Sequence, residues 1–250
     1  MILFTHIEKC AGTSFNQILS LTYPRYFHVT KNNFGGNESK NDLKINEFNK
    51  IVKFYPSIIG GHSIRPYLRF LNEDKNFDKI TFLRNPIDRY MSQYNHDHER
   101  GFSPDIDYFI KRSYTENFMV NKLAGENDIN KARFYLNQYS FVGDVDNYNQ
   151  SINALSDVLN VKFYGLNEKK NVRLNNTNYL NFEDLTENQK VLVYDKNKLD
   201  IKLYEEFVIN SNVISRYPNS YIFKTPSKLR LKITNRLNKE KKIIINKIRE

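Results

Sequence analysis

"FTHIEKCAGTSF", residues 4–15, is the stretch of sequence that decides the fold. The largely apolar residues 1–7 predict a short buried strand. Ala11 and Gly12 predict a tight turn after it, and Thr13 or Ser14 is expected to cap the helix that follows. The positions expected to form the buried face of that helix are Phe15, Ile18, Leu19 and Thr22.

A strand, a tight turn and a helix start in this order predict an anion site. The first amides of a helix have no partner within the helix, and they point, with the positive end of the helix dipole, at one spot. Lys9 adds a full positive charge there. The stretch therefore has the parts needed to hold an anion such as a phosphate.

The bulk composition is that of an ordinary globular protein. With 250 residues, 40% of them hydrophobic, the chain can bury a full core, and one α/β domain is expected. A single cysteine, Cys10, excludes an intramolecular disulfide, so nothing requires an oxidising compartment. No apolar run reaches the roughly 20 residues of a membrane span, and residues 1–7 lack the length and the basic start of a signal peptide. The expected location is the cytoplasm.

The positive charge is concentrated at the carboxyl end. The chain has 38 basic and 28 acidic residues, of which residues 224–250 contain ten basic and two acidic ones. That tail accounts for +8 of the formal net charge of +10. We therefore expect a domain at 1–223 and a basic amphipathic helix at 224–250, and the nearly neutral domain argues against nucleic acid as a partner.

Strands and helices are expected to alternate along the chain. Apolar runs predict further strands at 57–62, 79–84, 141–143 and 161–165. Helices are expected at 43–54, 86–98, 148–159 and 227–249, in two or three pieces over 106–139, and over most of 183–209, with a polar surface loop at 31–42. This alternation predicts a parallel sheet of four or five strands covered by helices on both faces.

Ligands of such sheets bind beyond the carboxyl ends of the strands. Three loops fall there: 8–14, 60–63 and 84–86. The first is not a Walker A motif, GxxxxGK[ST], because Lys9 precedes Gly12 by three residues and no lysine stands directly before the hydroxyl residues. Taken alone, this loop is equally well a tight turn with a surface lysine.

The segment "FLRNPIDRYMSQY", residues 82–94, supplies a second possible anion site. Arg84 ends a buried strand, where a charge is costly unless it meets an anion. Asn85 and Pro86 predict the start of a helix, and Ser92 lies two turns into it. Arg84 and Ser92 together would suit a phosphate. The alternative is that Arg84 pairs with a structural carboxylate, such as Asp88.

Together these segments resemble the sulfotransferase family. "HIEKCAGTSF" is similar to the family's 5'-phosphosulfate loop, HxPKxAGTS, and "FLRNPIDRYMSQY" to its 3'-phosphate segment, FLRxPxxRxxSxY. The match is closest to the branch of carbohydrate O-sulfotransferases that act on heparan and chondroitin. It continues through "FVGDVDNYNQSINAL" and "NKLDIKLYEEF", and so spans most of residues 1–209. One departure is Glu8, where the family commonly has proline, which leaves the loop less rigid but removes no ligand.

The resemblance implies a three-layer fold like that of the P-loop kinases and a defined chemistry. The donor would be 3'-phosphoadenosine 5'-phosphosulfate (PAPS), the acceptor a hydroxyl of a glycan, and no metal would be needed. Lys9 would neutralise the charge that develops on the leaving oxygen, and Arg84 and Ser92 would hold the 3'-phosphate. The residues implied to bind the donor are Lys9, Ala11, Gly12, Thr13, Ser14, Phe15, Arg84 and Ser92.

The acceptor hydroxyl needs a base, and the resemblance implies His62. It follows Gly60 and Gly61 and is similar to the histidine of the "GH" pair in the heparan 2-O-sulfotransferase subgroup. The alternative is a histidine that only ends a strand. His6 is expected to pack at its strand end, and Cys10 has no role as a nucleophile because the transfer is direct. A metal site at His96 and His98, beside Asp97 and Glu99, is less expected than an exposed helix end, and Asn171, Arg173 and residues 175–178 give no firm prediction.

Two other functions stay open at this point. A nucleotide kinase would need Mg²⁺ and ATP, which the missing Walker A Lys-Ser/Thr pair disfavours. A non-catalytic binder of anionic polymers would act through the tail and survive the loss of Lys9.

In the tail, an apolar stripe with basic flanks suits either an anionic membrane surface or packing against the domain or a second subunit. The stripe consists of Leu229, Ile233, Leu237, Ile244 and Ile248. The acceptor's identity and the oligomeric state are left open by the sequence.

Overall fold

The computed structural model describes residues 1–29, 42–72, 77–164 and 179–210. Within these ranges a sheet of five parallel strands has the order β2-β3-β1-β4-β5. The strands are β1 (Ile2–Thr5), β2 (Tyr26–His28), β3 (Ile58–Gly61), β4 (Asp78–Leu83) and β5 (Phe141–Asp144). With β1 at the centre, the parallel register brings the carboxyl ends of all five strands to one edge.

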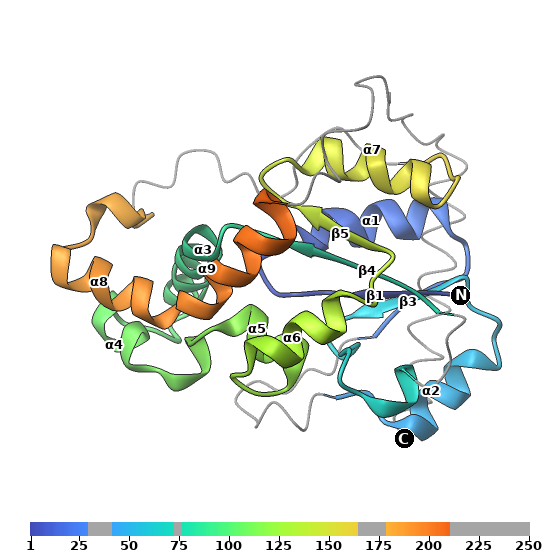
Figure 1. Ribbon diagram of the computed structural model, residues 1–250, viewed down its shortest axis with the longest axis horizontal. Coiled ribbons are helices and arrows are strands. Elements are labelled where there is room, and N and C mark those ends of the chain that lie inside the picture. Colours follow the sequence, from blue (N-terminus) through green and yellow to red (C-terminus); the bar gives the residue numbers. More distant parts are fainter. Residues whose placement is uncertain (30–41, 73–76, 165–178, 211–250) are drawn as a thin grey trace.

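Two helices, α1 (Gly12–Thr22) and α7 (Tyr148–Val158), cover one face of the sheet, above it in Figure 1. Phe4 and Phe82 of the strands contact Phe15 of α1, at ring-centroid distances of 4.8 Å each. Phe82 also contacts Tyr148 of α7. Alternate strand residues therefore anchor α1, and with it the loop that precedes this helix.

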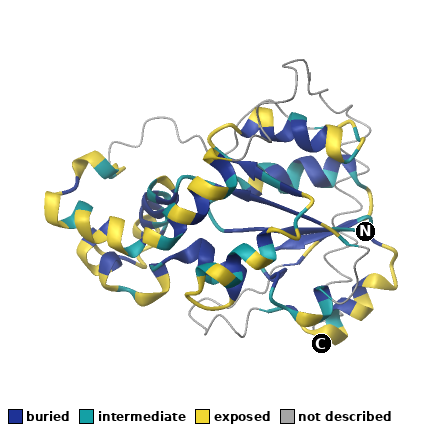
Figure 2. Cartoon of the chain, viewed as in Figure 1, coloured by how far each residue is buried: buried dark blue, intermediate teal, exposed yellow. Residues whose placement is uncertain are grey.

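The opposite face is covered by α2 (Ile45–Val52), α5 (Phe118–Ala124) and α6 (Ile129–Leu136). Leu3 and Ile59, which point away from α1, pack with Phe48 and Ile51 of α2 in a separate apolar cluster. The sheet is thus the middle of three layers. Figure 2 shows its strands as buried between helices whose outer faces are exposed.

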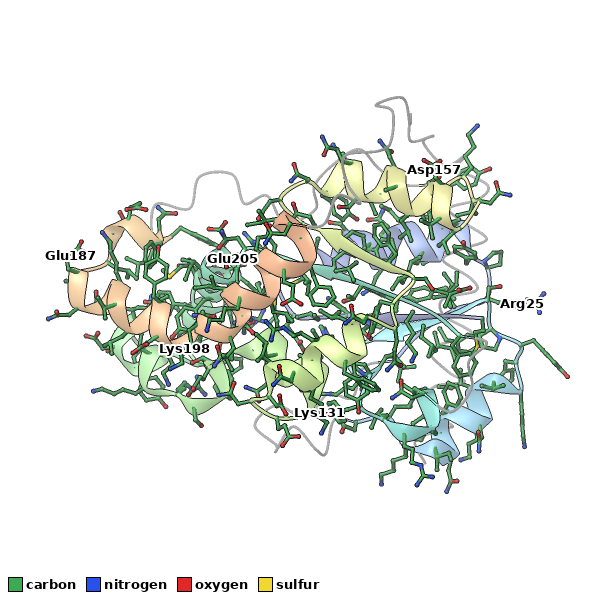
Figure 3. The ribbon with its side chains drawn as sticks, viewed as in Figure 1. Arg25, Lys131, Asp157, Glu187, Lys198 and Glu205 are labelled. Atoms are coloured by element: carbon green, nitrogen blue, oxygen red, sulfur yellow. The ribbon has the colours of Figure 1, made fainter. Side chains whose placement is uncertain are left out.

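A helical group extends from one end of the sheet. It consists of α3 (Pro86–Glu99), α4 (Ile106–Lys111), α8 (Glu187–Lys196) and α9 (Lys198–Tyr204), with a π-helical turn, η5 (Glu205–Ile209). Short 3-10 turns are η2 (Arg69–Leu71), η3 (Ser113–Thr115) and η4 (Phe182–Asp184). Tyr90, Phe109 and Val193 join α3, α4 and α8 in one apolar cluster. Charged side chains such as Glu187 and Lys198 extend outward from these helices (Figure 3).

The predicted fold class is confirmed: the structure is α/β, with a parallel five-stranded sheet between helices. The start of α3 is also confirmed, since the Asn85 side chain accepts hydrogen bonds from the amides of Ile87 and Asp88, with Pro86 at the first helical position. Helices predicted at 43–54, 148–159 and in pieces over 106–139 and 183–209 are present.

Two local predictions were wrong, and one strand was missed. The strand β2 was not predicted, and residues 161–164 form no regular strand. In that segment the Val161 amide bonds to the carbonyl of Ser156 at the end of α7, and the Tyr164 amide bonds to the Thr22 hydroxyl. Neither Thr13 nor Ser14 caps α1, because the N-cap is Ala11 and no side chain caps it.

The polar loop at 31–42 lies almost wholly outside the described residues, as do residues 171–178 and the basic tail 224–250. The division of the chain at residue 223 therefore stays a prediction. None of the helices in the described ranges is long and apolar enough to span a membrane.

Candidate active site

The loop between β1 and α1 is held in an unusual backbone conformation. Lys9 and Ala11 both have positive φ, 67° and 54°, a region that residues with a side chain rarely adopt. Between them Cys10 is buried, and its amide bonds to the Ile7 carbonyl at 3.2 Å. Burial raises the pKa of the Cys10 thiol to about 12, so this cysteine is a poor nucleophile. The buried residues therefore fix the path of the loop, while Lys9 is only partly buried.

The start of α1 requires glycine at position 12, because there is no room for a side chain. A Cβ atom there would overlap the imidazole ring of His6. His6 is 6% exposed, as its expected packing at the strand end requires, and its ring stacks on those of Phe4 and His62. Burial, with the nearby His62, holds the pKa of His6 well below its usual value, so His6 is neutral near pH 7.

The first turn of α1 lies at the carboxyl edge of the sheet. The Phe15 amide makes the first intrahelical hydrogen bond, to the Ala11 carbonyl at 3.1 Å. The amides of Gly12, Thr13 and Ser14 precede it, in the positions where helices bind anions. Phe15 itself is fully buried among Phe4 and Phe82. Its side chain is part of the core, and its predicted role in binding the donor stays a prediction.

Arg84 links the two predicted phosphate segments. Its Nη1 donates a hydrogen bond to the Lys9 carbonyl at 3.3 Å. Its Nε is buried and has no hydrogen-bond partner among the described residues. Asp88 is exposed, and across the described ranges no ion pair joins it to Arg84. Ser92 is partly buried on α3, and within the described part of the chain no hydrogen bond places it against Arg84. The structure thus brings Arg84 to the Lys9 loop and leaves the role of Ser92 a prediction.

His62 follows β3 directly and leans on the same loop. Its ring stacks on that of His6, with centroids 3.9 Å apart and planes inclined by 26°. Its Nδ1 lies 3.2 Å from the His6 carbonyl oxygen and 3.1 Å from Oε1 of Glu8. The side chain is 29% exposed. His28, at the end of β2, is exposed, with its ring centroid 6.4 Å from that of His62.

Glu8 and Lys122 are residues of this site that the sequence did not reveal. Lys122 of α5 is 1% exposed, and its Nζ lies 2.8 Å from Oε1 of Glu8 and 3.0 Å from the His62 carbonyl oxygen. Burial alone would raise the pKa of Glu8, but Lys122 and His62 hold it well below its usual value. Glu8 was noticed only because proline is common at this position in the family, and Lys122 carried no signal at all.

The two histidines near the end of α3 make other contacts. Nδ1 of His96 lies 3.4 Å from the Asp97 carboxylate, and Nδ1 of His98 lies 2.9 Å from the Ser103 carbonyl oxygen. Asp97 is buried and accepts a hydrogen bond from the Tyr114 hydroxyl. Within the described ranges, no group of three or more His, Cys, Asp or Glu residues is arranged to hold a metal ion.

A buried charge anchors α3 to the helices beside it. Arg89 is fully buried, with its guanidinium carbon 4.4 Å from the centre of the Phe118 ring. Asp200 attracts it electrostatically and accepts hydrogen bonds from the amides of Met119 and Val120, at 2.9 and 2.8 Å. This contact joins α3, α5 and α9 just beyond Arg84.

Comparison with known proteins identifies the family of the chain. The chain has no significant match among curated proteins. The profile of the sulfotransferase family matches residues 1–207, which include the β1–α1 loop, His62, Arg84 and all five strands. Because the match covers most of the chain, the protein belongs to the sulfotransferase family.

Proposed function

We propose that this protein transfers a sulfuryl group from PAPS to a hydroxyl of a glycan. The observation that supports this most directly is the hydrogen bond from Arg84 to the Lys9 carbonyl. It joins the segment that resembles a 3'-phosphate site to the one that resembles a 5'-phosphosulfate site. A donor with phosphates at both positions suits the pair.

The residues present fit such a donor. Arg84 has a buried Nε without a partner among the described residues, and a buried guanidinium favours an anionic neighbour. The amides of Gly12, Thr13 and Ser14 at the start of α1, with the partly buried Lys9, would hold the 5'-phosphosulfate. Ser92 would add a hydroxyl on the 3'-phosphate side. PAPS, when bound, supplies the sulfuryl group and leaves as adenosine 3',5'-bisphosphate.

The protein's contribution to the transfer is mostly positioning and electrostatics, as in phosphoryl transfer. Lys9 would stabilise the negative charge that grows on the leaving oxygen. His62 would take the proton of the acceptor hydroxyl, for which a partly exposed imidazole is suited. The glycan acceptor rests on the resemblance to the carbohydrate branch of the family.

Nucleotide binding tests the donor. Adenosine 3',5'-bisphosphate should raise the melting temperature clearly more than AMP does, because a ligand stabilises the folded protein according to its affinity for it. Arg84→Ala should remove this difference. Arg100→Ala, at the exposed carboxyl end of α3, should keep it. Equal stabilisation of the unaltered protein by both nucleotides would refute the proposed donor.

The acceptor can be identified with radiolabelled PAPS. Candidate glycans and non-carbohydrate hydroxyl compounds are offered in turn, with radiolabelled PAPS or radiolabelled ATP and with or without Mg²⁺, and labelled product is measured. Transfer to a glycan without added metal is expected. Transfer from ATP that depends on Mg²⁺ would instead indicate a kinase, and labelling of non-carbohydrate hydroxyls alone would contradict the glycan acceptor.

A further inference from the structure

The hydrogen bonds of His62 fix which of its two ring nitrogens carries a proton. Nδ1 lies between two oxygens, Oε1 of Glu8 at 3.1 Å and the His6 carbonyl oxygen at 3.2 Å. A peptide carbonyl has no proton to give, and an ionised carboxylate only accepts. Nδ1 must therefore be the donor. A neutral imidazole has one N–H, so Nε2 is left with a lone pair, as a base requires.

The position of Glu8 is itself fixed. Lys122, almost fully buried on α5, contacts Oε1 of Glu8 and also donates to the His62 carbonyl oxygen. Lys122 thus contacts both the Glu8 carboxylate and the backbone of His62, whose ring this carboxylate contacts. Because Lys122 and His62 hold the pKa of Glu8 well below its usual value, the carboxylate stays ionised at neutral pH. The stacked His6 ring, 3.9 Å away, constrains the plane of His62.

We propose that Glu8 is a positioning residue that orients His62 and keeps Nε2 available to the acceptor. The inference rests on the proposed function, in which His62 is the base. As the acceptor oxygen bonds to sulfur and the bond from sulfur to the phosphate oxygen breaks, Nε2 takes the proton of the hydroxyl. Glu8 stabilises the resulting imidazolium, and the proton then passes to water. This is the logic of a carboxylate–histidine pair in acyl transfer, here built from a loop glutamate.

The tautomer of His62 is the direct test. Nitrogen-15 NMR of histidine-labelled protein, at a mildly alkaline pH, should show a protonated Nδ1 and an unprotonated Nε2, with the signal assigned by its loss in His62→Gln. A proton on Nε2 would overturn the proposal. This measurement needs no donor, so it stands even if the proposed function fails.

Glu8→Gln tests the role in catalysis. Glutamine keeps an oxygen for Lys122 and removes the charge that faces His62. We expect kcat to fall about 10- to 100-fold, by analogy with the loss of a carboxylate that orients a metal-binding histidine, while adenosine 3',5'-bisphosphate still raises the melting temperature. Glu187→Gln, at a side chain that is 87% exposed on α8, should change neither quantity.

A double substitution separates positioning from a purely structural effect. If Glu8 acts through His62, then Glu8→Gln should slow the unaltered enzyme but have no further effect in a His62→Ala background. An equal loss in both backgrounds would show that Glu8 acts independently of His62. An unchanged kcat in Glu8→Gln, with nucleotide binding intact, would refute the inference and leave the proposed donor standing.

Discussion

At the residue scale, the β1–α1 loop combines strain with tight packing. Residues other than glycine pay on the order of 1–3 kcal/mol for a left-handed backbone, and both Lys9 and Ala11 adopt one. The buried Cys10 and the bond from Arg84 to the Lys9 carbonyl hold the loop in this form. The loop and the start of α1 therefore lie at the same edge of the sheet as His62 and Arg84.

The packing of Gly12 against His6 predicts a coupled loss of stability. Gly12→Ala should lower the free energy of unfolding by about 1–3 kcal/mol, as overpacking does, because the new methyl group overlaps the His6 ring. In a His6→Ala background the same substitution should cost clearly less, since the overlapping ring is gone. Urea unfolding of the four proteins measures the coupling. Additive losses would contradict the proposed overlap.

Lys9→Ala should lower turnover. If Lys9 neutralises the leaving oxygen, kcat falls by about 10²-fold or more, the scale of losing a donor that acts in the transition state. The melting temperature without ligand should change little, because Lys9 is only partly buried. Lys198→Ala, at an exposed position on α9, is the matched control for steady-state kinetics. An undiminished kcat in Lys9→Ala would assign the charge stabilisation to another residue.

The two segments that resemble phosphate sites could be recognised in the sequence because their signals are local. A strand end, a glycine, a lysine and a helix start lie within ten residues, and so do Arg84 and Ser92. The contact of Glu8 with Lys122 joins residues 114 positions apart. A lysine in the apolar helix "FMVNKLA" has no local mark of its partner. For this reason Lys9 and Arg84 could be recognised as candidate site residues in the sequence. The contacts of Glu8 and Lys122 with His62 could not.

At the element scale, the fold class could be predicted from the alternation of strands and helices along the chain. The shortest strand could not be predicted. The strand β2 has three residues and follows Pro24 and Arg25. Three residues are too few for the alternation of buried and exposed side chains to be recognised in the sequence. Residues 161–165 read as a strand because Val161 and Phe163 alternate with a lysine. Phe163 is indeed buried, but it packs near Phe15 while the Tyr164 amide bonds to a side chain of α1. Burial of one side chain and a single bridging residue, Tyr164, do not make a regular strand.

The contact between α3, α5 and α9 predicts a pH-dependent stability. Burial raises the pKa of Asp200 from 3.8 to about 6, although Arg89 and two amides oppose the rise. Between these values the folded protein binds more protons than the unfolded chain does. Ionising Asp200 therefore costs stability as the pH rises from about 4 to about 6.

Asp200→Asn removes this titration. The unfolding free energy of the unaltered protein, relative to that of Asp200→Asn, should fall by on the order of 2 kcal/mol over this pH range and then stay level. Asp157→Asn, on the exposed surface of α7, should show no such slope. Denaturant titrations at several pH values provide the measurement. A relative stability that rises with pH would show that Arg89 and the amides, and not burial, dominate at Asp200.

At the scale of the whole molecule, the charge divides the chain into two parts. Residues 1–223 carry a formal charge near +2, and residues 224–250 carry +8. The family match ends at residue 207, so the basic tail lies beyond it. The candidate site and the tail are therefore tested separately, and the functions of both stay proposals.

The tail's composition leads to a test of membrane association. An apolar stripe with lysine and arginine on its flanks would bury its apolar face among lipid headgroups and attract anionic lipids. If the protein is cytoplasmic, as the sequence predicts, this association would place it beside lipid-linked glycans under assembly. The full chain should co-sediment with vesicles that contain anionic phosphatidylserine at low salt, and less at high salt, because screening weakens the attraction.

Two comparisons make this test decisive. A chain that ends at residue 223 should stay in the supernatant while it keeps its nucleotide-dependent rise in melting temperature, since the predicted donor residues all precede residue 93. Neutral phosphatidylcholine vesicles should bind the full chain only weakly, because about 1 kcal/mol of attraction for each basic residue near the surface depends on anionic lipid. If the full chain ignores both kinds of vesicle but elutes as a larger species than the shortened one, the apolar stripe joins two subunits. If the two elute in proportion to their lengths, the stripe packs on its own domain.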